Sequence, residues 1–225
     1  SGPSDTVIVW EYLPGQYDQR ADSAEQCLSL LRTGMAEESA EVGTKPPLVR
    51  CAKMVILSGS GEKGFCAGLD MKESMETAPK MSTEEFYRFQ ARLARLNLHM
   101  RRAPQPIITA VHGAAAGQGF SFVLSSDIRI ISPDAKFSAA YINIGLGGAD
   151  MACSYLLPRM IGAGRAYEFM YTGKFMTSDE AMHLGLVSKI VEKDKLHETA
   201  MEYAKILMTK NHMGLRLTKE AINMN

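Results

Sequence analysis

The chain has 225 residues, of which 46% are hydrophobic and 22% charged, a composition typical of a globular protein with an apolar core. Lys plus Arg and Asp plus Glu each number 25, so no overall basic charge favours binding to nucleic acid or to an acidic membrane surface. No apolar run reaches the roughly 18 residues of a membrane-spanning helix, and no signal-peptide pattern opens the chain. The four cysteines form no CxxC pair, which argues against a zinc site or a disulfide framework. This cysteine usage favours an intracellular, reducing setting and leaves cytoplasmic, mitochondrial and peroxisomal locations open.

The first quarter of the chain is predicted to contain, in order, a strand, a helix, a loop and a second strand. Residues 6–10 are expected to form a short strand, and residues 21–33 have the apolar spacing of a helix. Residues 34–47, with a glycine and two prolines, are expected to form an irregular loop. Residues 54–57 predict a buried strand that ends at the small residues 58–61.

A long helix is predicted next. Ser82 and Glu85 have the spacing of a capping box at its start, apolar residues recur at helical spacing as far as Met100, and Pro104 ends it. The elements expected after it are a strand at 107–111, a loop of small residues at 113–119, a helix at 120–126 and a strand at 128–131.

The last third of the chain is predicted to be mostly helical. Thr177 and Glu180 form a second capping box, before a short helix that Gly185 closes. The other elements expected there are helices at 154–161, 163–171, 195–208 and 215–222 and a strand at 187–191. Strands and helices alternate along the chain, so the predicted class is α/β.

Residues 59–64 satisfy the GxGxxG pattern of dinucleotide-binding folds. That fingerprint opens directly into a helix, whereas residues 65–70 intervene here. The acidic residue expected about 20 positions later falls near Glu84, inside a predicted helix rather than at a strand end. These departures argue against dinucleotide binding.

Two segments of small residues have a backbone suited to binding an anion. In residues 65–70, Ala67 and Gly68 lack bulk, so a ligand could approach the backbone and the N–H of Leu69 could point into a pocket. In residues 110–121, a strand runs through small residues into a helix, whose first N–H groups are unsatisfied and partly positive. One donor from each segment would form an oxyanion hole. A tight turn in the first segment and close packing of a helix on a strand in the second are the alternatives.

These segments resemble a known family. Residues 54–73 closely resemble the first signature of the enoyl-CoA hydratase/isomerase (crotonase) superfamily, and residues 107–127 resemble the second. Further matches follow in the family's order, so that the resemblance covers roughly residues 52–223. It implies a crotonase (ClpP-like) ββα spiral over residues 1–162, with the coenzyme A site and the oxyanion hole. A helical trimerisation region over residues 163–225 would follow, which ends before the family's last helices.

The resemblance implies an enzyme that binds a fatty acyl-CoA thioester and stabilises its enolate. The backbone N–H groups of Leu69 and Gln118 would hold the thioester oxygen. The other positions assigned to substrate binding are Ala67, Gly68, Asp70, Met71 and Gly117. Coenzyme A would be part of the substrate, with no separate cofactor and no metal, and the chain would form homotrimers or hexamers without a nucleic-acid or membrane partner.

Two positions depart from the family's hydratases, which carry a pair of glutamates that activate and deliver water. Ser121 and Tyr141 stand at these two positions. A serine or tyrosine hydroxyl is a poor general base near neutral pH. Plain hydration is therefore not expected, and Tyr141 is favoured as part of the pocket wall.

Asp150 is the acidic residue that remains for proton transfer. It lies twelve residues before Gly162, the distance at which dienoyl-CoA isomerases carry an aspartate. This match favours double-bond isomerisation with Asp150 as a single base, and an N-cap for a helix starting near Met151 is the alternative. Thioester hydrolysis and acyl-CoA binding without catalysis are the other functions left open.

His112 allows one further constellation. Ser121, His112 and Asp150 can be drawn as a nucleophilic triad, but the residues around Ser121 lack the GxSxG elbow. A structural, hydrogen-bonded histidine is the favoured interpretation of His112.

Overall fold

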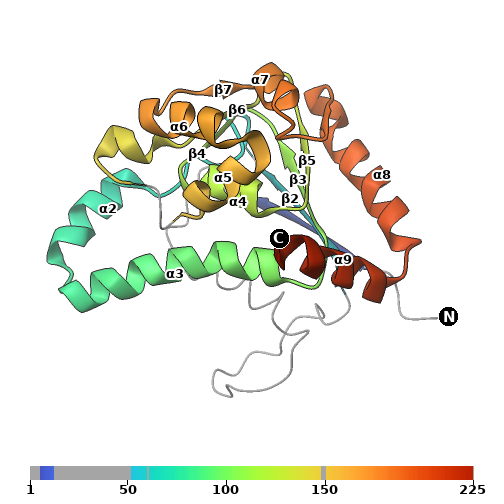
Figure 1. Cartoon of the computed structure of the whole chain (residues 1–225), viewed down its shortest axis with the longest axis horizontal. Coiled ribbons are helices and arrows are strands. Elements are labelled where there is room, and N and C mark those ends of the chain that lie inside the picture. Colours follow the sequence, from blue (N-terminus) through green and yellow to red (C-terminus); the bar gives the residue numbers. More distant parts are fainter. Residues whose placement is uncertain (1–5, 13–51, 60, 148–150, 225) are drawn as a thin grey trace, which may run out of the picture.

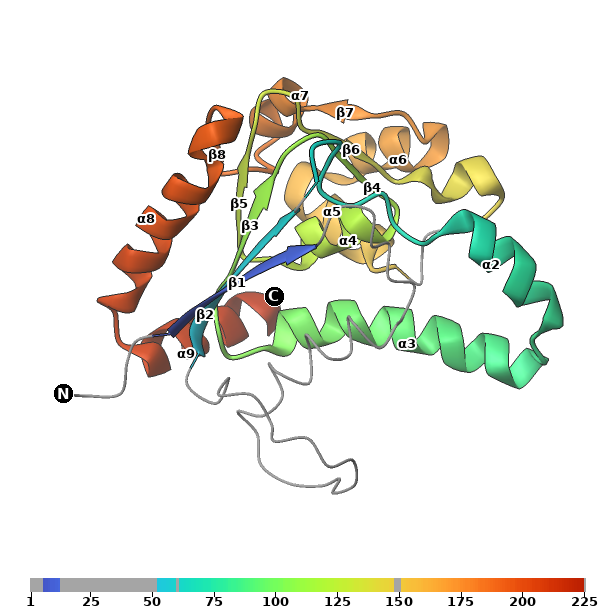
Figure 2. The same cartoon turned by 180° about the vertical axis from the view of Figure 1, so that it is seen from behind.

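The structure is a computed structural model that describes residues 6–12, 52–59, 61–147 and 151–224 (Figures 1 and 2). The helix predicted at 21–33 and the loop predicted at 34–47 lie outside these residues. In the described part of the chain the α-helices are α2 (Met71–Thr77), α3 (Thr83–Arg102), α4 (Gln118–Ser125), α5 (Cys153–Ile161), α6 (Ala163–Thr172), α7 (Ser178–His183), α8 (Leu196–Met208) and α9 (His212–Met224). Short 3-10 helices span Ala78–Lys80, Ala140–Ile144 and Lys193–Lys195.

A five-stranded parallel sheet forms the centre of the described fold, with strand order β1-β2-β3-β5-β8. Its strands are β1 (Thr6–Tyr12), β2 (Ala52–Gly59), β3 (Ile107–Val111), β5 (Ile128–Ile131) and β8 (Lys189–Ile190). All five predicted strands are confirmed, although the last is limited to two residues because only Lys189 and Ile190 pair with β5.

Both faces of this sheet are buried, as is usual for parallel sheets. Along β3, Ile108 and Ala110 face a cluster that α8 completes with Ala200 and other apolar side chains. Ile107 and Val111 point the other way, into the larger core beneath α4 and α5. Figure 1 shows α8 on one flank of the sheet and α4 and α5 on the opposite side. Because side chains alternate along a strand, these continuous apolar runs supply both core layers at once.

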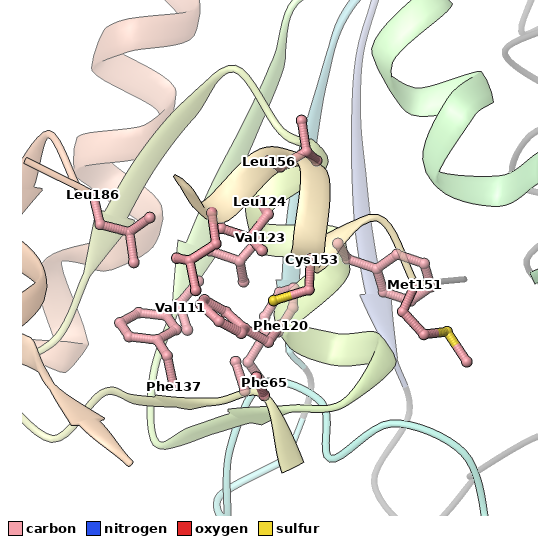
Figure 3. Close-up of a cluster of buried hydrophobic side chains, with 14 of the residues drawn as sticks. Phe65, Val111, Phe120, Val123, Leu124, Phe137, Met151, Cys153, Leu156 and Leu186 are labelled. Carbon is pink, nitrogen blue, oxygen red and sulfur yellow. The ribbon is translucent and has the colours of Figure 1, made fainter. Parts of the chain in front are cut away.

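The larger core surrounds α4, all eight residues of which are buried. Phe120 of α4 meets Phe137 with the ring centroids 5.6 Å apart, and Figure 3 shows both rings beside Val111 and Cys153. Burial raises the pKa of the Cys153 thiol to about 12, so this cysteine stays protonated at neutral pH and serves as an apolar packing residue.

A second, three-stranded sheet lies next to α4. It consists of β4 (Ala114–Ala116), β6 (Lys136–Ser138) and β7 (Met176–Thr177), with order β4-β6-β7. The prediction that residues 113–119 form only a loop is therefore wrong. Alanine has a low intrinsic preference for strands, and β4 forms because Ala115 pairs with Phe137 of β6. The helix predicted at 120–126 begins two residues earlier than expected, at Gln118.

Both predicted capping boxes are present. In α3 the Ser82 and Glu85 side chains each accept from the other residue's backbone N–H, and Thr177 and Glu180 do the same in α7. At α5, by contrast, Ala152 holds the N-cap position with a left-handed φ of 61°. The interpretation of Asp150 as the N-cap of this helix is therefore wrong.

Among the described helices, none combines the length and the apolar character needed to cross a bilayer.

The C-terminal helix α9 is attached to the sheet through a buried cation. The Lys219 ammonium lies 2.7 Å from an Asp127 carboxylate oxygen and donates to the carbonyl oxygens of Met100 and Gln105, each at 3.0 Å. Asp127 also accepts from the backbone N–H of Ile107 at 2.8 Å, at the start of β3. Burial lowers the pKa of Lys219, and the Asp127 carboxylate partly offsets this effect.

Removing the Asp127 carboxylate is expected to leave the Lys219 charge buried without its counter-ion. We expect Asp127→Ala to lower the free energy of unfolding by about 3 kcal/mol, measured by urea denaturation. Lys219→Met should lower the free energy of unfolding by less than Asp127→Ala does, because it removes the buried charge together with its need for a counter-ion. Glu84→Gln, in the exposed pair with Arg88, serves as the control and should change stability by less than about 0.5 kcal/mol. Equal effects of Asp127→Ala and Glu84→Gln would contradict this view of the cluster.

Candidate active site

The two segments of small residues lie against each other through their backbones. The N–H of Cys66 donates to the carbonyl oxygen of Ala114 at 3.1 Å, and the N–H of Ala116 donates to the carbonyl oxygen of Cys66 at 2.9 Å. Gly64 and Gly113 form a further bridge. The first segment therefore runs alongside β4 up to the start of α4.

This contact is possible only with glycine at particular positions. A Cβ at Gly119 would lie 2.0 Å from the carbonyl oxygen of Cys66, well inside the contact distance of the two atoms. Gly68 has a φ of +97°, and a Cβ there would lie 3.1 Å from the backbone nitrogen of Gln118. The backbone of Gly68 therefore lies close to the backbone nitrogen of Gln118, the first residue of α4.

Two backbone N–H groups at this junction have no acceptor among the described residues. Gln118 is the first residue of α4, where helix N–H groups have no partner within the helix. Leu69 directly follows Gly68 and packs against the larger core. Among the described residues, neither the N–H of Leu69 nor that of Gln118 donates a hydrogen bond. The partial positive charge at the start of α4 adds to the attraction for an oxyanion.

Gly117 precedes these donors and holds a backbone conformation, φ 55° and ψ −126°, that side chains disfavour. Its N–H donates to the carbonyl oxygen of Ser138 at 3.1 Å. Its carbonyl oxygen accepts from the N–H of Ser121 at 3.1 Å and from the hydroxyl of Tyr141 at 2.8 Å. The peptide unit between Gly117 and Gln118 is therefore held at its carbonyl side, with its N–H directed away from these partners.

Ser121 and Tyr141 meet although they come from different elements. Their hydroxyl oxygens are 2.6 Å apart, and both side chains are buried. Tyr141 lies in the 3-10 helix Ala140–Ile144, while Ser121 lies in the first turn of α4. Two hydroxyls thus stand side by side beneath the Gly117 carbonyl, where they can donate hydrogen bonds but offer no carboxylate for water activation.

The remaining predicted substrate-binding residues lie around the start of α2. Ala67 is exposed, and Met71, the first residue of α2, is 40% exposed. A carboxylate oxygen of Asp70 accepts from the N–H of Lys72 at 2.8 Å, which satisfies one of the first N–H groups of α2. Asp70 therefore has a local structural role, and contact of these residues with coenzyme A remains a prediction. Asp150 lies outside the described residues.

His112 is a structural histidine, as predicted. Its Nε2 lies 2.5 Å from the carbonyl oxygen of Gly61, so it ties the loop after β2 to the end of β3. A hydrogen bond from Ser132 lowers the pKa of nearby Asp134, and His112 contributes in the same direction. The Ser121 hydroxyl pairs with Tyr141, and the His112 ring pairs with the carbonyl of Gly61. The Ser121–His112 hydrogen bond that a nucleophilic triad requires is therefore not formed.

The dinucleotide alternative is also wrong. After Gly64 the chain continues through Phe65, which is buried, and the next helix, α2, does not begin until Met71. The fingerprint needs a helix directly at its last glycine to hold the pyrophosphate.

Within the described residues, no group of three or more His, Cys, Asp or Glu side chains is placed to hold a metal ion.

Sequence reasoning missed Asn97, a polar residue beneath the candidate site. Asn97 is only 1% exposed, and its side-chain oxygen accepts from Gln118 Nε2 at 3.3 Å. The signal that could have identified it is a polar residue within the apolar stripe of α3, beside Leu93 and Leu96.

Comparison with known proteins gives consistent matches. The family model described as enoyl-CoA hydratase/isomerase matches residues 49–225. A protein of Mycobacterium leprae named as a probable enoyl-CoA hydratase is 39% identical over 176 residues, which are 76% of this chain and 58% of that protein. The 1,2-epoxyphenylacetyl-CoA isomerase of Escherichia coli is 37% identical over 182 residues, covering 78% of this chain and 65% of that one. The chain thus spans about three fifths of the length of these relatives.

A solved structure gives the same match for the fold. The monofunctional enoyl-CoA isomerase of Mycobacterium smegmatis superposes with a TM-score of 0.71 at 30% identity. The match covers 99% of this chain and 90% of that one. The predicted α/β class and crotonase fold are therefore confirmed.

The contact between the two segments predicts that Gly119→Ala is strongly destabilising. The added methyl group would displace the carbonyl of Cys66, at a cost of about 3 kcal/mol in the free energy of unfolding. Gly164→Ala is the matched control, because Gly164 lies in α6 with no atom within 4 Å of the new Cβ. We expect this control to be neutral or to stabilise by up to about 1 kcal/mol in thermal or urea unfolding. Equal stability of the two variants would show that the segments are further apart than described.

Proposed function

The chain belongs to the enoyl-CoA hydratase/isomerase family, and on this basis we propose that it binds an acyl-CoA thioester and stabilises its enolate. The thioester oxygen is held by the backbone N–H groups of Leu69 and Gln118. Fixed backbone donors suit this task because they need little reorganisation as negative charge develops on the oxygen. Coenzyme A is bound as part of the substrate, and the reaction uses no separate cofactor.

The observation that carries this proposal is the contact of Gly68 with the N-terminus of α4. A Cβ at position 68 would lie 3.1 Å from the Gln118 nitrogen, so the residue before Leu69 and the first N–H of α4 are neighbours. Among the described residues, neither Leu69 nor Gln118 donates its backbone N–H to the protein. Two adjacent donors without protein acceptors fit a ligand oxygen that arrives from outside.

We propose double-bond isomerisation rather than hydration as the reaction. The hydroxyls of Ser121 and Tyr141 stand where the family's hydratases carry glutamates, and their 2.6 Å contact engages them with each other. In the proposed reaction, Asp150 removes a proton from an acyl carbon, and the electron pair moves onto the thioester oxygen. The same carboxyl group then returns the proton to a different carbon. The resemblance to dienoyl-CoA isomerases supports this role for Asp150, and the structural similarity to a monofunctional enoyl-CoA isomerase supports the reaction class.

The substrate proposal extends to the coenzyme A portion and to assembly. Main-chain groups around residues 67–69 contact the adenine, and Asp70 and Met71 also bind the substrate. The relative exposure of Ala67 and Met71 is compatible with such contacts. The chain assembles as a homotrimer or hexamer, as the family resemblance implies.

The hydroxyl pair also favours a second candidate function, which is acyl-CoA binding without catalysis. The hydroxyls of Ser121 and Tyr141 contact each other and the Gly117 carbonyl, and neither supplies a carboxylate as a general base. In this case the chain would hold the thioester at Leu69 and Gln118 without moving a proton. Turnover measurements separate the two candidates.

Purified protein should isomerise 3-enoyl-CoA to 2-enoyl-CoA and should not hydrate 2-enoyl-CoA at a comparable rate. Asp150→Asn removes the proposed base and is expected to lower kcat at least about 100-fold, without weakening acyl-CoA binding. Asp179→Asn, an exposed acid in α7, is the control and should leave kcat unchanged. Unchanged isomerisation in Asp150→Asn would exclude the single-base mechanism. Acyl-CoA binding without turnover of either substrate would instead favour the binding function.

A further inference from the structure

A buried amide lies behind the candidate oxyanion site. Asn97 is 1% exposed and lies on the face of α3 that carries Leu93, Leu96 and Met100 into the core. Burying an amide among apolar side chains is costly unless it is hydrogen-bonded. The contacts of Asn97 therefore account for its place in the core.

Asn97 contacts both ends of α4. Its Oδ1 accepts from Nε2 of Gln118 at 3.3 Å and from Oγ of Ser125 at 3.2 Å, while its Nδ2 donates to the carbonyl oxygen of Leu93 at 3.4 Å. Gln118 is the first residue of α4 and Ser125 is the last. One amide oxygen thus links α3 to both ends of α4, the helix that begins beside Gly68.

The Gln118 side chain depends on this contact. Gln118 is 5% exposed, and its Oε1 is buried without a hydrogen-bond partner among the described residues. The bond from Nε2 to Asn97 is therefore the hydrogen bond that fixes the Gln118 amide in this part of the chain. The side-chain amide and the backbone N–H both belong to Gln118. Holding the side-chain amide in place therefore restricts rotation of the backbone N–H.

On the opposite side, the Tyr141 hydroxyl holds the Gly117 carbonyl at 2.8 Å. The peptide unit that carries the Gln118 N–H is therefore fixed on one side by Tyr141 and, through the Gln118 side chain, on the other side by Asn97. We propose that Asn97 is a positioning residue, which orients the Gln118 N–H toward the thioester oxygen without touching the substrate. This inference rests on the proposed function of the Leu69 and Gln118 donors.

The test measures the hydrogen bond at the thioester directly. Butyryl-CoA labelled with ¹³C at its carbonyl carbon is a non-reacting probe, and its infrared carbonyl stretch falls in frequency when the oxygen accepts hydrogen bonds. We expect a clear fall on binding to the wild-type protein. In Asn97→Leu, which keeps the number of heavy atoms in the side chain but removes the acceptor, at least half of this fall should be lost. The kcat for isomerisation should drop about 10-fold, with KM within about twofold.

Three further variants separate positioning from packing. Gln118→Met keeps the backbone N–H and removes the amide, so it should reproduce Asn97→Leu, and the double variant should be no worse than either single variant. Asn97→Asp keeps an acceptor oxygen and should recover most of the frequency change. Ser125→Ala removes the other hydrogen bond to Asn97 at the far end of α4, and both the frequency and kcat should stay as in the wild type.

The outcomes distinguish this inference from the proposed function. No frequency change in the wild-type protein would overturn thioester binding at the two donors, and this inference with it. A wild-type change that is retained in Asn97→Leu and Gln118→Met would overturn the positioning role alone. An equal loss in Ser125→Ala would also overturn it, because it would show that general packing of α4 is responsible. Should Asn97→Leu fail to fold, Gln118→Met still decides the question.

Discussion

The candidate site depends on one backbone contact, in which the segment after β2 lies alongside β4 and the start of α4. The hydrogen bonds of Cys66 to Ala114 and Ala116 hold this contact, and the absence of a side chain at Gly119 allows it. It brings Gly68 to the first N–H of α4, so that donors from two distant parts of the sequence meet. The helix itself cannot shift freely, because all eight of its residues are packed in the core.

Much of the fold could be predicted because local patterns and tertiary packing agree. Continuous apolar runs identify β3 and β5, and both capping boxes mark helix starts from four residues each. The strand β4 was missed because three alanines do not favour a strand, and the partner that stabilises them, β6, lies about 20 residues further along the chain. The left-handed Ala152 at the start of α5 was missed for a related reason, since tertiary packing overrides its local preference.

The candidate site could be predicted only in part, for a similar physical reason. Small residues indicate where backbone approaches closely, which singled out Gly68. Gln118 could be selected only through the resemblance to the family's second signature. The pairing of Ser121 with Tyr141 and the anchoring of Gln118 by Asn97 depend on side chains from separate elements. Both hydroxyls donate to the carbonyl oxygen of Gly117. In the proposed function they supply no carboxylate to activate water, and the backbone donors stabilise the enolate.

The central claim is that the backbone N–H groups of Leu69 and Gln118 bind the thioester oxygen. Amide ¹H–¹⁵N chemical shifts during titration with butyryl-CoA test it at these two atoms. If the claim is correct, both amide protons move downfield and by more than that of Ala115, which lies in β4 behind the site. Saturable binding of butyryl-CoA that leaves the Leu69 and Gln118 amide protons unmoved would contradict the claim.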